Sequence, residues 1–177
     1  MHCPRRRHFL KATAFALPAA AVPVLGLASV EPRRLRFYHT HTGEKLDLVY
    51  HENGAYVPNA LDEINHVLRD FRSNDVFPID PTLLDFLHAA RNRVGSAGSF
   101  EIISAYRSPA TNEMLRKRGG GVAQKSQHLK GKAIDVRLTD VATADLRQAS
   151  LDLARGGVGY YPKSDFVHLD TGRVRWW

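Results

Sequence analysis

The sequence predicts a small α+β domain, in which an antiparallel sheet carries helices on one side. Three observations predict this class. The chain has 177 residues, 44% of them hydrophobic, which can bury one sizeable core but hardly two. Apolar residues alternate in several short runs, as in strands, and recur at helical spacing in others. Gly, Pro, Ser and Asp residues separate these runs, and the sequence holds no internal repeat or second-domain linker.

The N-terminus has the anatomy of an export signal. Three arginines and a lysine precede an Ala-rich apolar run over residues 12–27, which ends in a small-x-small cleavage pattern. The run contains two prolines and is shorter than the roughly 20 residues of a spanning helix, which disfavours a permanent anchor. Residues 6–11, RRHFLK, resemble the twin-arginine export motif RRxFLK. We therefore expect residues 1–28 to be a twin-arginine signal peptide and residues 29–177 to be a periplasmic domain that meets the membrane only during export.

The charge of the mature chain disfavours nucleic acid as a partner. Removing residues 1–28 takes away four basic residues and no acidic one, so the net charge falls from +7 to about +3. The remaining basic residues are dispersed, and no basic-aromatic module stands out. The single cysteine, Cys3, lies in the removed segment, so the mature protein has no thiol to misoxidise outside the cytoplasm. We expect a monomer that binds no nucleic acid.

The first element of the domain is a predicted hairpin. Two runs of alternating apolar residues, within 33–38 and 45–50, flank the turn-forming segment HTGE. Hairpin histidines are more often solvated or hydrogen-bonded than metal-bound, so we assign three of them to the surface. These are His39, His41 and His51.

Two helices follow the hairpin. Residues 59–72 carry apolar side chains at helical spacing. Residues 80–94 do so again, with Asp80 as N-cap and Pro81 at the first helical position. Both helices are expected to cover the core.

The second half alternates strands and helices. The segment FEIISAY, residues 100–106, predicts a strand after the Gly/Ser-rich break GSAGS. A short helix begins at Ser108 and Pro109 and ends at the GGG segment. Residues 140–154 predict one more helix.

A carboxylate lies in the middle of an otherwise apolar strand, AIDVRL, at residues 133–138. Because side chains alternate along a strand, Asp135 lies on the face opposite Ile134 and Val136, toward a cleft or solvent. His128 precedes it by seven residues, and Gly131 lets the backbone turn sharply enough to bring imidazole and carboxylate together. A shared metal ion would account for both residues.

A second histidine belongs to the same predicted site. Residues 166–170, FVHLD, predict a strand with His168 between apolar neighbours. Together, His128, Asp135 and His168 make a set of two histidines and one carboxylate with an open fourth position, which is typical of catalytic zinc. Non-haem iron also uses such a set, but its usual motif spaces histidine and carboxylate by one residue, so zinc is favoured.

Two motifs in these segments resemble those of a known family. SQHLKGKAID fits S-x-H-x-x-G-x-A-x-D, and DFVH fits acid-x-x-His. Both are similar to motifs of the M15-type zinc peptidases, which share a metal site with D-Ala-D-Ala carboxypeptidases, VanX-like dipeptidases and hedgehog-type proteins. The closer resemblance, over residues 33–177, is to the DUF882 branch of murein endopeptidases. Ala105 departs from the glycine common in that branch.

The resemblance implies roles for individual residues. It implies a hedgehog/D-Ala-D-Ala peptidase-like fold, with Zn²⁺ on His128, Asp135 and His168. It also implies that Asp165 is the catalytic base and that Arg107 holds substrate. The planar guanidinium of Arg107 can grip a peptide carboxylate or carbonyl, although a structural ion pair is the alternative reading.

Further residues near these motifs have supporting roles in this interpretation. Asp170 lies on the same strand face as His168 and can orient its imidazole. Ser126 is interpreted as a residue that bonds the local backbone and not as a nucleophile. Trp176 and Trp177 are interpreted as a packed C-terminal edge.

The predicted function is zinc-dependent hydrolysis of cross-link peptides in peptidoglycan. One alternative is a non-catalytic wall-binding or regulatory domain that keeps zinc for structure, and Asp165 argues against it. Another is a D-Ala-D-Ala carboxypeptidase or dipeptidase. The sequence leaves open whether the bond cleaved is D-Ala–diaminopimelate or diaminopimelate–diaminopimelate.

Overall fold

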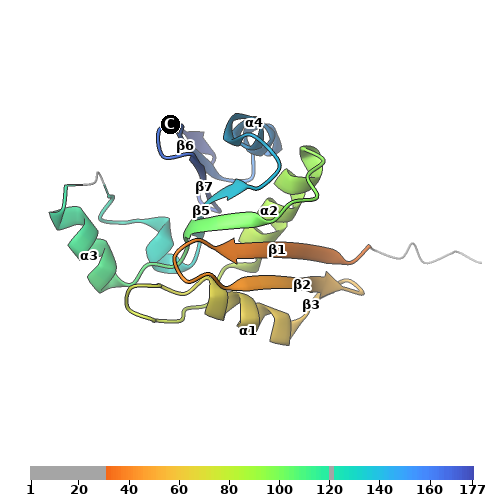
Figure 1. Ribbon diagram of the computed structural model, residues 1–177, viewed down its shortest axis with the longest axis horizontal. Coiled ribbons are helices and arrows are strands. Elements are labelled where there is room, and N and C mark those ends of the chain that lie inside the picture. Colours follow the sequence, from red (N-terminus) through yellow and green to blue (C-terminus); the bar gives the residue numbers. More distant parts are fainter. Residues whose placement is uncertain (1–30, 120–121) are drawn as a thin grey trace, which may run out of the picture.

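The computed structural model describes residues 31–119 and 122–177, so the predicted export signal lies outside the described residues. One sheet runs through the molecule in the order β3-β2-β1-β4-β5-β7-β6-β8 (Figure 1). Its strands are β1 Arg33–His39, β2 Lys45–Glu52, β3 Ala55–Tyr56, β4 Phe100–Ser104, β5 Ala133–Leu138, β6 Gly157–Tyr161, β7 Phe166–Asp170 and β8 Arg175–Trp176. The predicted hairpin is confirmed as the antiparallel pair β1–β2.

The sheet is mostly antiparallel but contains two parallel pairs, β1–β4 and β6–β8. The first arises because two helices follow the hairpin before β4 enters beside β1, which leaves room for the chain to cross over and run in the same direction. The second arises because the chain turns back after β7 and lays β8 along the outer edge of β6.

Among residues 31–119 and 122–177, four α-helices and one 3₁₀ helix accompany the sheet: α1 Pro58–Val67, α2 Pro81–Arg93, α3 Pro109–Lys117, η1 Gln127–Lys130 and α4 Thr143–Leu153. The predicted starts of two of them are confirmed, since Asp80 accepts the N–H of Thr82 and Ser108 accepts the N–H of Thr111. Within the described part of the chain, no helix is long and apolar enough to cross a membrane.

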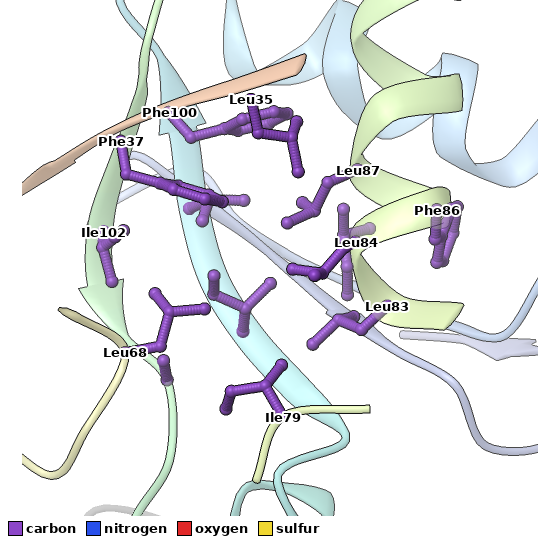
Figure 2. Packing of buried hydrophobic residues seen from close by; sticks show 14 of the residues in the cluster. Leu35, Phe37, Leu68, Ile79, Leu83, Leu84, Phe86, Leu87, Phe100 and Ile102 are labelled. Atoms are coloured by element: carbon purple, nitrogen blue, oxygen red, sulfur yellow. The ribbon is translucent and has the colours of Figure 1, made fainter. Parts of the chain in front are cut away.

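Helices α1, α2 and α4 contribute to a single hydrophobic core on one face of the sheet. Figure 2 shows the leucines of α2 pointing toward the apolar side chains of β1 and β4. Helix α3 lies apart from the other three helices (Figure 1). The predicted placement of the helices on one side of the sheet therefore holds for α1, α2 and α4 but not for α3.

The opposite face of the central strands is polar. In β5, Ile134 and Val136 belong to the core, so the intervening Asp135 lies on the other face. The register pairs Asp135 with His168 of the neighbouring β7. This pairing places the two side chains next to each other.

The surface assignment of the hairpin histidines is wrong for two of the three. His39 continues the alternation of Leu35 and Phe37 toward the core and is fully buried, and His51 is also buried. His41 lies in the turn, is exposed, and stacks on Phe71 with ring centroids 4.0 Å apart. Strand periodicity, which applies to every residue type, therefore decided the burial of His39.

Candidate metal centre

Three side chains from three elements converge on the polar face. They are His128 of η1, Asp135 of β5 and His168 of β7, and we call them the metal group. One ligand atom from each lies within 4.8 Å of the others, and all three residues are buried. His168 Nδ1 lies 2.8 Å from Asp135 Oδ1, and His128 Nε2 lies 3.4 Å from the same oxygen. The structure thus brings together the predicted ligands.

Local backbone structure directs His128 toward the strands. Ser126 caps η1 by accepting the N–H of His128, which is the local role expected from the sequence. Gly131 ends η1 in a left-handed conformation, with φ of 64°. A Cβ at Gly131 would lie 2.2 Å from the carbonyl oxygen of Pro78, so only glycine fits the turn that leads from His128 into β5.

The hydrogen-bond partners of the two imidazoles define which nitrogens are free. Nδ1 of His128 lies 2.6 Å from the carbonyl oxygen of Ala105, which can only accept, so Nδ1 carries the proton and Nε2 is a lone-pair donor. Nε2 of His168 lies 3.0 Å from Asp170 Oδ2, so Nε2 keeps its proton and Nδ1 is the nitrogen left to bind a cation. Both free nitrogens point toward the carboxylate of Asp135. Three electron-pair donors this close fit a shared cation.

The charges around the metal group favour a positive species at its centre. Burial alone would lower the pKa of His168, but Asp135 and Asp170 on either side raise it to about 9, so without an ion Nδ1 also holds a proton, which a bound metal ion would replace. Burial would raise the pKa of Asp135, yet its contacts with His128 and His168 hold it below the ordinary range, so the carboxylate is ionised. Two neutral imidazoles and one carboxylate are ligands that zinc prefers, so the residues fit this ion.

The metal group borders a cavity of about 590 Å³. Arg107 lines this cavity beside it, with Nη2 at 4.0 Å from Asp135 Oδ2. Its Nη1 makes a long contact of 3.4 Å with Asn112, and its buried Nε has no hydrogen-bond partner among the described residues. Burial lowers the pKa of Arg107, and the nearby Asp135 opposes this effect. The guanidinium of Arg107 therefore keeps hydrogen-bond donors that the described residues do not use.

The structure does not bring Asp165, the predicted catalytic base, to the metal group. Asp165 lies in the turn before β7 with φ of 51°, and its side chain is 60% exposed. Its carboxylate lies 3.3 Å from Arg137 and accepts a hydrogen bond from Thr143 at 3.0 Å. It does not line the cavity. This geometry supports a contact between β5 and the start of α4, and it does not support proton transfer at the metal group.

The end of the chain contributes two residues that the sequence analysis did not assign to the site. Arg175 of β8 lines the cavity and pairs with Asp170, and Trp177 lines the cavity with its ring centroid 5.3 Å from that of His168. Trp177 is therefore part of the cavity wall although it is 49% exposed, and Trp176 is 68% exposed, so the two tryptophans do not form the packed edge that the sequence predicted. The signal that could have revealed Arg175 is the turn-forming Thr171-Gly172 after β7, which returns the chain toward Asp170.

The chain is similar over most of its length to known proteins of one family. The family model described as peptidoglycan L,D-endopeptidase MepK (Peptidase_M15_2) matches residues 27–177. The MepK of Escherichia coli strain K12 is 41% identical over 175 residues, covering 97% of this chain and 96% of the relative. The probable MepK of Haemophilus influenzae is 38% identical over 176 residues, covering 97% and 95%.

A solved structure, the L-Ala D-Glu endopeptidase ChiX of Serratia marcescens, aligns with a TM-score of 0.37 and 22% identity over 54% of this chain and 69% of that chain. That likeness is too small to inform the fold or the site. The family match and the two relatives span nearly the whole chain. The chain therefore belongs to the M15 zinc peptidase family, in the branch described as peptidoglycan L,D-endopeptidase MepK.

Proposed function

We propose that the chain is a zinc-dependent endopeptidase that hydrolyses peptide bonds in the cross-links of peptidoglycan. The observation that carries this proposal is the metal group, where Nε2 of His128, Oδ1 of Asp135 and Nδ1 of His168 converge beside an open cavity. Three protein ligands next to a cavity are the arrangement of a catalytic site, since a structural zinc site uses four. The relatives, which are named as peptidoglycan L,D-endopeptidases, supply the substrate class.

Zinc in the metal group would supply Lewis acidity, lowering the pKa of bound water toward about 7 and polarising the scissile carbonyl. The chain's own residues prepare the site for it. Ala105 and Asp170 each hold one imidazole in the tautomer that leaves its inner nitrogen free. The open side of the group faces the cavity, where a peptide can enter.

Arg107 is proposed to hold the substrate peptide next to the scissile bond. It is 8% exposed, its Nε has no partner among the described residues, and it lines the cavity beside Asp135. A guanidinium buried with unused donors can bind a peptide carboxylate or carbonyl through a planar fork. The structural ion-pair alternative is weakened because the distance to Asp135 is 4.0 Å, at the limit for such a pair.

We further propose that the protein works in the periplasm and reaches it by the twin-arginine pathway. The support is the RRHFLK segment before an apolar run, together with relatives whose names place their substrate in the cell wall.

Digestion of purified muropeptide dimers, followed by mass spectrometry, tests the proposed activity. We expect the zinc-loaded protein to convert cross-linked dimers into monomers with the uptake of one water molecule. The variants His128→Ala and His168→Ala should lose this activity, because two remaining ligands bind zinc poorly. His41→Ala, which removes an exposed histidine in the hairpin turn, is the matched control and should remain active.

The products also separate the proposal from its alternatives. A D-Ala-D-Ala carboxypeptidase would remove a terminal D-Ala and leave dimers joined. A wall-binding domain would bind zinc and leave every muropeptide intact. Either result would contradict the endopeptidase proposal, and the masses of the monomers identify which cross-link is cleaved.

A further inference from the structure

Asp170, which contacts His168, is a buried carboxylate with an unusually complete set of partners. It is fully buried and accepts the N–H of Gly172 at 2.8 Å in addition to Nε2 of His168 at 3.0 Å. Two further hydrogen bonds come from Arg175, with Nη1 at 3.0 Å from Oδ1 and Nη2 at 2.6 Å from Oδ2. A buried carboxylate is tolerated only when paired in this way, so the orientation of Asp170 depends on the arginine fork.

The neighbouring strand is shaped to receive this pair. Gly157 of β6 lies opposite both residues in the register, pairing with Asp170 on one side and Arg175 on the other. A Cβ at Gly157 would lie 2.4 Å from Asp170 Oδ2 and 2.4 Å from Arg175 Nη1. Only glycine leaves room at this position for the carboxylate and the guanidinium to lie against the sheet.

Arg175 is itself held by the residue that follows β8, Trp177. Its guanidinium lies over the ring of Trp177, 5.0 Å from the centroid. The backbone of Trp177 bonds to β6 on both sides, through Val158 and Tyr160, and its indole N–H donates to Tyr161 at 2.9 Å. Arg175 thus presents its fork to Asp170 from a fixed edge of the sheet.

We propose that Arg175 is a positioning residue for the metal group: by fixing Asp170, it keeps His168 in the tautomer whose Nδ1 is free to bind the metal ion. The inference rests on the proposed metal site and adds a residue that does not itself touch the ion. Without the fork, Asp170 loses two of its four hydrogen bonds and no longer holds the proton on Nε2 of His168 in one place.

Zinc affinity of full-length variants, measured by competition with a chromophoric chelator, tests the proposal. Arg175→Gln should weaken zinc binding by ~10- to 100-fold, the usual effect of losing a partner that orients a ligand. Arg175→Lys keeps the charge but not the fork, so its affinity should fall between those of Arg175→Gln and the wild type. The control Arg93→Gln removes an exposed arginine–aspartate pair, to Asp152, and should bind zinc as the wild type does.

A spectroscopic readout separates positioning from general loss of structure. ¹⁵N NMR of the histidine rings should show His168 protonated at Nε2 in the zinc-loaded wild type, and a loss of this single tautomer in Arg175→Gln. If Arg175→Gln does not fold, Arg175→Lys carries the test alone. Affinity within twofold of wild type, with the Nε2–H tautomer intact, would overturn the inference. A wild-type protein that binds no zinc would overturn the proposed function as well, which distinguishes the two failures.

Discussion

Asp165 shows how a motif can name a residue without fixing where its side chain points. The acid-x-x-His spacing places Asp165 three residues before His168, and in a regular strand such residues face opposite sides. The chain does turn at this point, as the base assignment requires, but the turn delivers the carboxylate to Arg137 and Thr143. These contacts tie the turn before β7 to β5 and to the start of α4.

We therefore expect Asp165→Asn to keep zinc and to retain turnover of muropeptide dimers within about threefold of wild type, because an exposed carboxylate outside the cavity is not placed to accept a proton there. The measurement is kcat/KM with zinc content determined in parallel. Asp135→Asn, which alters a residue of the metal group, is the comparison and should lose both zinc and activity. A ~10²-fold loss in Asp165→Asn with zinc retained would restore Asp165 as the base and require the turn to rearrange on substrate binding.

At the scale of single elements, the end of β1 carries a pH-sensitive group away from the metal group. The pKa of His39 is lowered from 6.5 to about 4, chiefly by burial, with smaller lowering effects of His41 and Arg69 that Glu44 opposes. An unfolded His39 would bind a proton near pH 6.5, whereas the folded one binds it only near pH 4. Its contribution to stability is therefore complete above pH 6.5 and is lost as the pH falls from 6.5 toward 4.

Replacing His39 by phenylalanine should flatten this part of the pH profile. Between pH 7 and pH 4.5, we expect the wild type to lose on the order of 2 kcal/mol more unfolding free energy than His39→Phe, as measured by urea titration. The comparison cancels the other titrating groups, which both proteins share. His41→Phe changes the exposed neighbour, whose effect on His39 is smaller than that of burial, and should keep most of the wild-type slope. Equal slopes in the wild type and His39→Phe would mean that His39 takes up its proton without unfolding.

The features of the fold that could be predicted are those that depend on neighbouring residues in the sequence, namely helix starts and the alternation of side chains along a strand. Asp80 and Ser108 start helices where a cap is expected, and the alternation in AIDVRL places Asp135 on the face opposite the core. The parallel neighbour of β1 was not predictable, because strand order depends on how the helices pack and not on the strand residues themselves. The Arg175–Asp170 contact was missed for a similar reason, since it needs the chain to return along β6.

At the scale of the whole molecule, the metal group joins elements that are distant in the sequence. His128 precedes β5, and His168 lies in β7, 40 residues later, with α4 and β6 between them. The site therefore forms only when this half of the sheet is assembled. An ion that binds the folded state and not the unfolded chain stabilises the former by mass action.

Zinc should consequently raise the melting temperature of the whole domain. At free zinc about 1,000 times above Kd, the expected stabilisation is about 4 kcal/mol, which corresponds to roughly 10 °C for a domain of this size. Differential scanning calorimetry with buffered zinc and with a chelator measures the difference. His128→Ala should melt at the same temperature in both buffers, because its metal group is incomplete, whereas His41→Ala should respond to zinc as the wild type does. A wild-type melting temperature that does not change with zinc would show that the three converging side chains do not hold the ion in the folded state.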